Sequence, residues 1–97
     1  MKLEVEVIEI NGTCAVYEAG DKFELIDGYK LQHSEGKLIC MHALASLMPF
    51  YNAMAKGVKP EKMGLAGKKE GQLYFQCMDP ERITGGGTAV FKVKKVL

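Results

Sequence analysis

Three cysteines are the residues of this chain best suited to chemistry: Cys14, Cys40 and Cys77. Each lies in a different segment, and none belongs to a C-x-x-C pair. A thiolate can act as a nucleophile or a metal ligand, whereas a protonated thiol in a core is a small apolar side chain. The spacing leaves two interpretations open: the three thiols converge on one site, or each fills part of the core.

The convergent interpretation makes Cys40 and Cys77 neighbours. Cys40 begins the predicted helical segment, where the helix dipole acidifies a thiol, and Cys77 ends a predicted strand just before Asp79. Two Cα atoms within about 7 Å would allow a disulfide, and Cys14 would join from the opening turn. The candidate ligand-binding or thiol site is therefore Cys14, Cys40, Cys77 and Asp79.

Zinc binding by the three cysteines and His42 is a further hypothesis. Their spacing differs from the short paired spacings of structural zinc sites, and residues 40 and 42 of one helix would point about 200° apart. We therefore expect no metal, and the sequence names no cofactor. The other histidine, His33, is expected on the surface of a loop, and two histidines in these positions do not define a Ser-His-Asp triad.

The composition predicts one domain over residues 1–97. Apolar residues make up 47% of the chain and charged residues 26%, which is enough for a core and an ordinary surface. The formal net charge of +1 provides no strong attraction for nucleic acid or anionic lipid. The start of the chain is unlike a signal peptide, and no run reaches the roughly 20 apolar residues of a membrane helix. We therefore expect a cytoplasmic protein with free thiols, no nucleic-acid partner and no membrane contact.

Alternation of apolar and polar residues predicts strands over residues 2–7, 22–26, 29–32, 72–78 and 89–96. The alternation slips at residues 8–10, which predicts a β-bulge. Asn11-Gly12 and Asp27-Gly28 are tight-turn signals. Residues 13–19 fit a returning hairpin strand or a loop, and the glycine-rich residues 81–88 are expected to be a flexible loop.

The one clear helical pattern covers residues 37–56. Its apolar stripe consists of Cys40, Leu44, Leu47, Met48, Tyr51 and Ala55. Pro49 interrupts the pattern, so the helix is either kinked near Ala45 or split into two pieces, the second beginning at Pro49. The predicted fold class is α+β: a small antiparallel sheet of four or five strands packed on one long, kinked or split helix. The expected centre of the core consists of Leu44, Leu47, Tyr51, Leu73 and Phe75.

Five short motifs follow one another along nearly the whole chain: Gly12-x-Cys14, Ala19-Gly20-Asp21-Lys22-Phe23-Glu24-Leu25, Cys40-x-x-Ala43-x-x-x-Leu47-x-Pro49, Cys77-x-Asp79-Pro80 and Val90-Phe91-x-Val93-x-Lys95. In this order they resemble a family of small prokaryotic proteins catalogued as an uncharacterised repeat protein, whose function is unassigned. The resemblance implies that the three cysteines belong to the family pattern, and it implies no activity. The chain departs from that pattern at Met78, where a proline is usual, and in a longer loop through the triple glycine.

These observations predict a small binding or accessory domain with a pocket for a small-molecule ligand near the three cysteines. The first alternative is a thiol-dependent enzyme or redox protein that uses Cys40 or Cys77. The second alternative is an interaction module that forms a homodimer through Met41, Phe50 and Met54. Thiol reactivity at neutral pH separates the first two hypotheses, and solution mass as a function of concentration tests the third.

Overall fold

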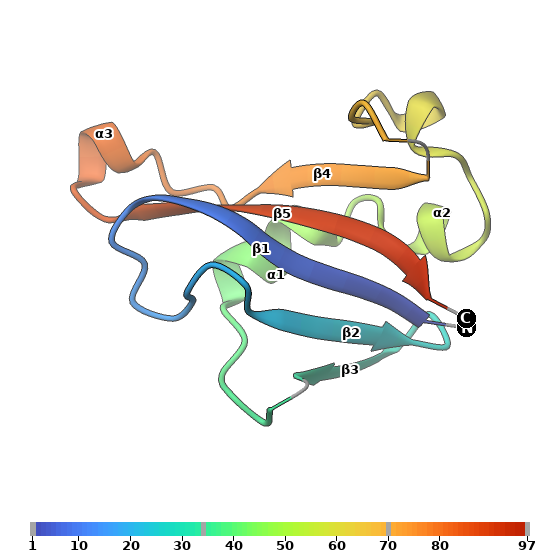
Figure 1. The fold of residues 1–97 in the computed structure, drawn as a ribbon, viewed down its shortest axis with the longest axis horizontal. Helices are drawn as coiled ribbons and strands as arrows, with labels where there is room; N and C mark the ends of the chain where they lie inside the picture. The colour runs from blue at the N-terminus through green and yellow to red at the C-terminus, as the bar shows by residue number, and fades with distance from the viewer. Residues whose placement is uncertain (1, 34, 70, 97) are drawn as a thin grey trace.

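The computed structural model describes residues 2–33, 35–69 and 71–96, and its main element is one antiparallel sheet (Figure 1). The sheet is formed by β1 (Lys2–Gly12), β2 (Lys22–Ile26), β3 (Lys30–His33), β4 (Gln72–Gln76) and β5 (Gly87–Val96). The strand order is β3-β2-β1-β5-β4. The longest strands, β1 and β5, therefore pair at the centre, and the sheet of five antiparallel strands lies within the predicted range.

Two local features of the sheet are confirmed. The register between β1 and β5 shifts between Val7 and Glu9, at the predicted bulge. Asp27 and Gly28 have φ values of 55° and 81° and connect β2 to β3, as their turn signal predicted. Asn11-Gly12 does not form a two-residue hairpin, because β1 stays paired with β5 as far as Gly12 and the chain then continues as a loop to residue 21.

The predicted long helix, and with it the predicted fold class, is wrong. Within the described residues there are three short α-helices: α1 (Met41–Leu47), α2 (Tyr51–Ala55) and α3 (Glu81–Thr84). A single 3-10 helix, η1 (Pro60–Met63), follows α2. Cys40 is extended, with φ −75° and ψ 129°, so α1 begins only at Met41. At the other end Pro49 has no N–H to donate, and the Phe50 N–H bonds to the Leu47 carbonyl at 3.1 Å instead of continuing the helical pattern.

The core lies between one face of the sheet and the two helices α1 and α2, which lie behind the sheet in Figure 1. Its most buried large side chains are Leu3, Val5, Val7, Phe23, Leu73, Phe91 and Val93. Of the predicted core centre, Leu47, Leu73 and Phe75 are buried, whereas Leu44 and Tyr51 are only half-buried. The sheet dominates because its strands present more inward-facing side chains than two helices of seven and five residues.

The buried aromatic side chains meet at Phe91. Its ring stacks on that of Phe75 with centroids 4.7 Å apart and meets the Tyr17 ring edge-on at 5.6 Å. Met54 is also buried, which removes it from the dimer surface expected from the sequence. Met41 remains exposed, and Phe50 is half-buried.

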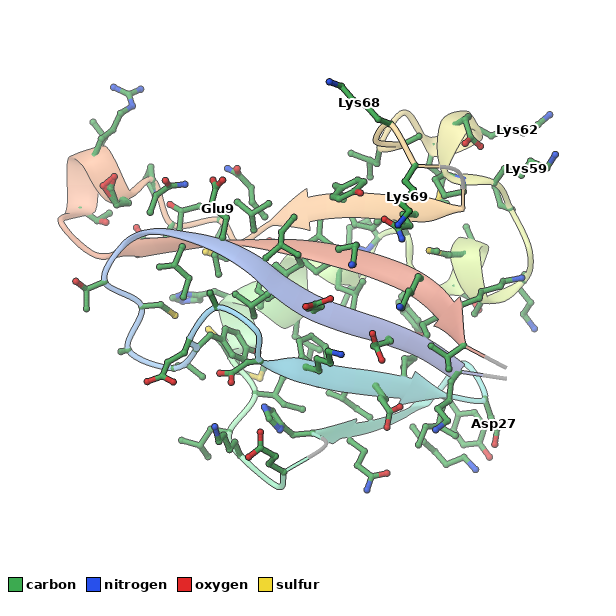
Figure 2. All side chains as sticks on the ribbon, viewed as in Figure 1. Glu9, Asp27, Lys59, Lys62, Lys68 and Lys69 are labelled. Carbon is green, nitrogen blue, oxygen red and sulfur yellow. The ribbon has the colours of Figure 1, made fainter. Side chains whose placement is uncertain are left out.

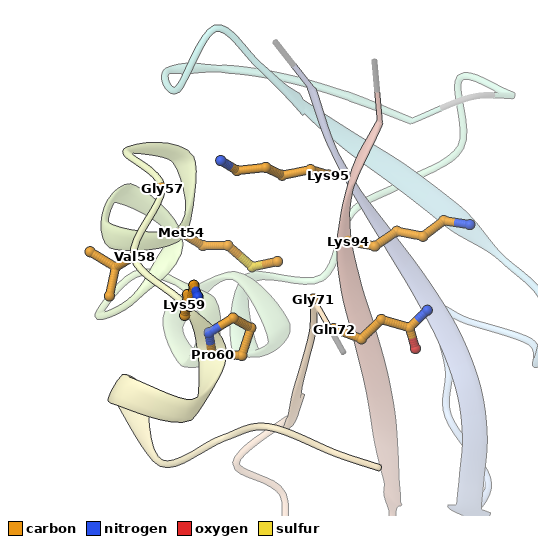
Figure 3. A pocket seen from close by; sticks show the side chains of 9 residues that line it. All are labelled: Met54, Gly57, Val58, Lys59, Pro60, Gly71, Gln72, Lys94 and Lys95. Atoms are coloured by element: carbon orange, nitrogen blue, oxygen red, sulfur yellow. The ribbon is translucent and has the colours of Figure 1, made fainter. Parts of the chain in front are cut away.

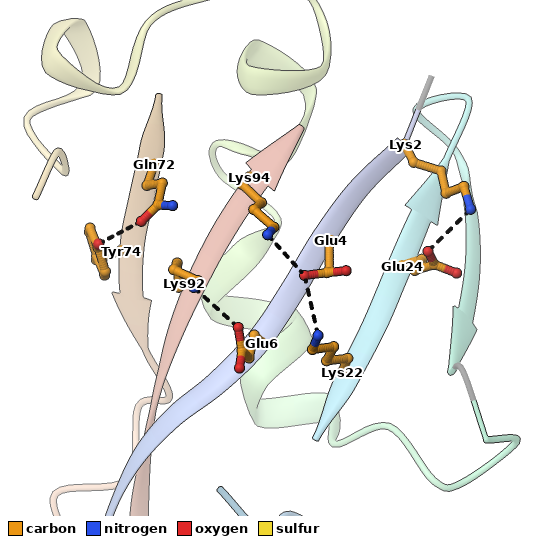
Figure 4. A network of polar contacts seen from close by, with 9 residues as sticks. All are labelled: Lys2, Glu4, Glu6, Lys22, Glu24, Gln72, Tyr74, Lys92 and Lys94. Atoms are coloured by element: carbon orange, nitrogen blue, oxygen red, sulfur yellow. Dashed lines mark hydrogen bonds and ion pairs between the residues drawn. The ribbon is translucent and has the colours of Figure 1, made fainter. Parts of the chain in front are cut away.

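The other face of the sheet carries rows of opposite charges (Figure 4). Glu4 Oε1 lies 3.8 Å from Lys22 Nζ and 3.7 Å from Lys94 Nζ, and Glu6 pairs with Lys92 at 3.2 Å. Further lysines, Lys59, Lys62, Lys68 and Lys69, lie along the segment between α2 and β4 (Figure 2). Among the described residues, no helix combines the length and apolarity needed to cross a membrane.

Candidate functional site

One cavity of about 300 Å³ brings the three cysteines together. Cys14 reaches it from the loop after β1, Cys40 from the extended residue before α1, and Cys77 from the position directly after β4. Asp79 lines the same cavity, so all four residues proposed from the sequence lie around one space. The distance between Cys40 and Cys77 stays a prediction.

Cys77 is held by hydrogen bonds to β5. Its N–H donates to the Ala89 carbonyl at 3.0 Å, and the Ala89 N–H donates to the Cys77 sulfur at 3.3 Å. The Cys77 thiol in turn donates to the Gly87 carbonyl at 3.7 Å. The residue is only 7% exposed. Because the thiol proton has an acceptor and the sulfur has a donor, the hydrogen bonds of Cys77 are satisfied within the fold, which indicates a structural side chain.

Tyr17 connects the other two cysteines. Its backbone N–H donates to the Cys14 sulfur at 3.3 Å, and its hydroxyl oxygen accepts the Cys40 N–H at 2.9 Å. The ring is buried against Phe23 and Phe91. Burial raises the pKa of Tyr17 to about 12, although the hydrogen bond from Cys40 acts in the opposite direction. The phenol is therefore neutral at physiological pH and positions the segments that carry Cys14 and Cys40.

Gly86 and Gly87 of the triple glycine line the cavity, and the expectation of a flexible loop over residues 81–88 is wrong. Residues 81–84 form α3, which Gly85 ends in the left-handed conformation with φ 74°. A Cβ on Gly87 would lie 2.5 Å from the Thr13 carbonyl carbon and 2.6 Å from the Cys14 nitrogen. The Thr13 N–H also donates to the Gly86 carbonyl at 3.1 Å. The loop that carries Cys14 is thus packed directly on the start of β5. This close approach requires a residue without a side chain at position 87, which is glycine.

Asp79 organises the turn between β4 and β5. Its carboxylate accepts the Gly87 N–H at 3.3 Å and the Thr84 hydroxyl, and its carbonyl accepts the Thr88 hydroxyl. A Cβ on Gly86 would lie 2.5 Å from Asp79 Oδ2, so a side chain there would displace the Asp79 carboxylate. These contacts assign a structural role to Asp79. A role in ligand binding stays a prediction.

His42 lines the same cavity, although the sequence placed it on the helix side opposite Cys40. That argument treated both residues as helical. Cys40 is extended, so the helical angle between them does not apply. No local signal marks Cys40 as the residue before the helix, because cysteine is not a preferred N-cap residue and makes no capping hydrogen bond here. Across residues 2–33, 35–69 and 71–96, no group of three or more His, Cys, Asp or Glu side chains is arranged to hold a metal ion.

His33 is buried, which corrects the expectation of a surface position. It is 5% exposed, and its Nδ1 accepts the Glu35 N–H at 3.1 Å. The neutral ring therefore carries its proton on Nε2, which is buried and has no hydrogen-bond partner within the described residues. His33 pairs with Phe23 across β2 and β3, so the alternation of β3 turns it toward the core.

A second cavity of about 430 Å³ lies between α2, η1 and the ends of β4 and β5 (Figure 3). Lys95 extends across it, whereas Lys94 points away toward its ion pair with Glu4. Among the residues that the structure describes, the titratable side chains that line it are lysines. The larger cavity thus has no cysteine, histidine or carboxylate among these described residues, so the cavity lined by the cysteines is the stronger candidate site.

Comparisons with known proteins identify no relative: no family model, curated protein or solved structure matches the chain. The function is therefore argued from the cavity and its residues.

Proposed function

We propose that the protein is a small binding domain that takes a small, uncharged and largely apolar molecule into the cavity lined by the cysteines. The observation that carries this proposal is the shared cavity itself, to which three cysteines from distant segments contribute. Most of its other lining residues are small or apolar, including Ala43, Ala89 and the ring of Tyr17. Such a concave, mostly apolar space with a few polar groups is typical of ligand sites.

The volume limits the size of the ligand. Apolar cavities on the order of 150 Å³ hold benzene, and this cavity of about 300 Å³ is at the lower end of known ligand pockets. A molecule of about one or two rings therefore matches it, and larger cofactors would extend into solvent. We also propose a cytoplasmic location, because three free cysteines require a reducing compartment. Nucleic acid is not a proposed partner, since the formal net charge is only +1.

The family resemblance is part of the same proposal. If the chain belongs with the small prokaryotic proteins that it resembles, the cysteine positions belong to the pattern of the family. Their meeting around one cavity then fits a common binding role.

Titration with benzyl alcohol, followed in amide NMR spectra, tests the proposed site. We expect saturable shifts of the Tyr17, Cys40 and Ala89 amides. Ala43→Leu should abolish them, because Ala43 is fully buried and lines the cavity. Ala53→Leu is the matched control, since it adds the same atoms to α2 outside this cavity.

Both leucine variants must first be shown to fold by circular dichroism, because overpacking costs about 1–3 kcal/mol. Shifts centred on Met54 and Lys95 would assign binding to the other cavity and contradict the proposal. Shifts that survive Ala43→Leu unchanged would contradict it as well.

A further inference from the structure

We infer that the cavity is also a thiol–disulfide exchange site for small disulfides, in which Cys14 and Cys40 react and Cys77 does not. The inference rests on the proposed function, because the small disulfide must first enter the same cavity. It differs from the hypothesis based on the sequence, which paired Cys40 with Cys77. Three observations carry it: the hydrogen bonds of the thiols, the position of Tyr17, and the exposure of the loop after β1.

The hydrogen bonds separate one thiol from the other two. The Cys77 thiol donates to a carbonyl and is buried, so its proton is held and its sulfur is shielded. Cys14 and Cys40 are both half-buried at the cavity. The Cys14 sulfur accepts the Tyr17 N–H at 3.3 Å, as the Cys77 sulfur accepts that of Ala89, so the thiols differ in burial and in whether the thiol proton is donated to a carbonyl. Within the described residues, neither Cys14 nor Cys40 donates its thiol proton to a carbonyl.

Tyr17 ties the two reactive cysteines to one residue of the cavity, Cys14 at its backbone and Cys40 at its hydroxyl. One end of this residue contacts the Cys14 sulfur, and the other contacts the Cys40 nitrogen. Thr13, Ala15 and Val16 are exposed, so the loop that carries Cys14 has no core side chain between its start and Tyr17. Such a loop can adjust its backbone more easily than a strand can. The backbone of the loop is held at Thr13 by Gly86, so the Cys14 sulfur approaches Cys40 through residues 14–16 and rotation of its own side chain, whereas Cys77 is tied to β5.

The exchange requires two steps and a small disulfide as the oxidant. The Cys14 thiolate attacks one sulfur of the small disulfide, whose S–S bond breaks, and the departing thiolate takes up a proton. The Cys40 thiolate then attacks the Cys14 sulfur and forms the Cys14–Cys40 disulfide, and the second small thiol leaves. His42, which lines the cavity, accepts the Cys40 proton and passes it to the second departing thiolate. In total, one small disulfide becomes two thiols and the protein loses two hydrogen atoms.

The test treats the reduced, intact protein with hydroxyethyl disulfide and maps the products without reduction. We expect an intramolecular Cys14–Cys40 disulfide in the wild type and in Cys77→Ser. Cys14→Ser and Cys40→Ser should stop at a mixed disulfide on the remaining reactive cysteine. A product that contains Cys77, a crosslink between molecules, or mixed disulfides alone in the wild type would overturn the inference.

A measurement on the wild type covers the case in which Cys77→Ser does not fold. Alkylation of the native protein should modify Cys77 at least about tenfold more slowly than Cys14 and Cys40, because a buried thiol reacts only after local opening. Equal rates for the three thiols would refute the assignment. Binding of benzyl alcohol is measured separately, so the exchange can fail while the proposed binding function stands.

Discussion

Gly87→Ala tests the packing that forms the cavity wall. The new Cβ would lie 2.5 Å from the Thr13 carbonyl carbon, and ordinary contact begins at 3.4 Å. The loop and β5 must therefore separate by about 0.9 Å. Such overpacking costs about 1–3 kcal/mol, and loss of the hydrogen bond between Thr13 and Gly86 adds about 1 kcal/mol. We expect the free energy of unfolding to fall by about 2–4 kcal/mol, a large part of the roughly 5–15 kcal/mol typical of a domain.

A urea melt measures this loss, which corresponds to a midpoint about 1–2 M lower for a typical m value. The rate of Cys14 alkylation should rise at the same time, because the displaced loop carries that residue. Gly20→Ala is the matched control. It has φ 96° but nothing within 4 Å of the added Cβ, so it costs only backbone strain of about 1–2 kcal/mol and leaves the rate of Cys14 alkylation unchanged. An unchanged midpoint together with an unchanged Cys14 rate for Gly87→Ala would refute the argument from close approach.

Three further predictions concern the core. Phe91→Ala should lower the free energy of unfolding by about 3–5 kcal/mol, because its fully buried ring contacts three other aromatic rings. The control Tyr29→Ala truncates a side chain that is 77% exposed and should change the free energy of unfolding by less than about 0.5 kcal/mol. Similar urea midpoints for the two variants would contradict this prediction. His33→Leu should leave the free energy of unfolding at neutral pH unchanged or raise it, because the substitution removes a buried N–H that has no partner in the described residues. A fall of more than about 1 kcal/mol in a urea melt would contradict this prediction. Ultraviolet titration should show a tyrosine with a pKa of about 12 that disappears in Tyr17→Phe. Because the pKa of Tyr17 is raised from 10.0 in the folded state, its contribution to the free energy of unfolding is present below pH 10 and is lost as the pH rises through about 12. A tyrosine titration of Tyr17→Phe identical to that of the wild type would disprove the assignment of this pKa to Tyr17.

The strands could be predicted from the sequence because their signal is local. Alternation over a few residues placed β1, β2, β4 and β5 to within a few residues. The bulge and the Asp27-Gly28 turn followed from a break in that alternation and from residues that tolerate positive φ. Each of these features depends on neighbours in the chain and needs no knowledge of the rest of the fold.

The helical pattern misled because two separate helices pack on the same sheet. Apolar residues recur on both sides of Pro49, and the buried ones, Leu47 and Met54, belong to different helices. Continuity of a helix depends on each backbone hydrogen bond, which the apolar period does not report. The same limit affected His42, whose direction relative to Cys40 depends on the residue at which α1 begins.

The sequence by itself predicted that Cys40 begins a helical segment and Cys77 ends a strand, each in phase with apolar neighbours, whereas it left Cys14 in a hairpin strand or a loop. Only the tertiary structure decided that they line one cavity, because the strand order brings the loop after β1, the start of α1 and the end of β4 to the same part of the molecule. It also decided that the thiols differ. Cys77 is held by Gly87 and Ala89, which are 10 and 12 residues away in the chain. The hydrogen bonds and burial that distinguish a structural thiol from a reactive one depend on such distant segments. The pattern of apolar and polar residues around each cysteine therefore cannot predict them.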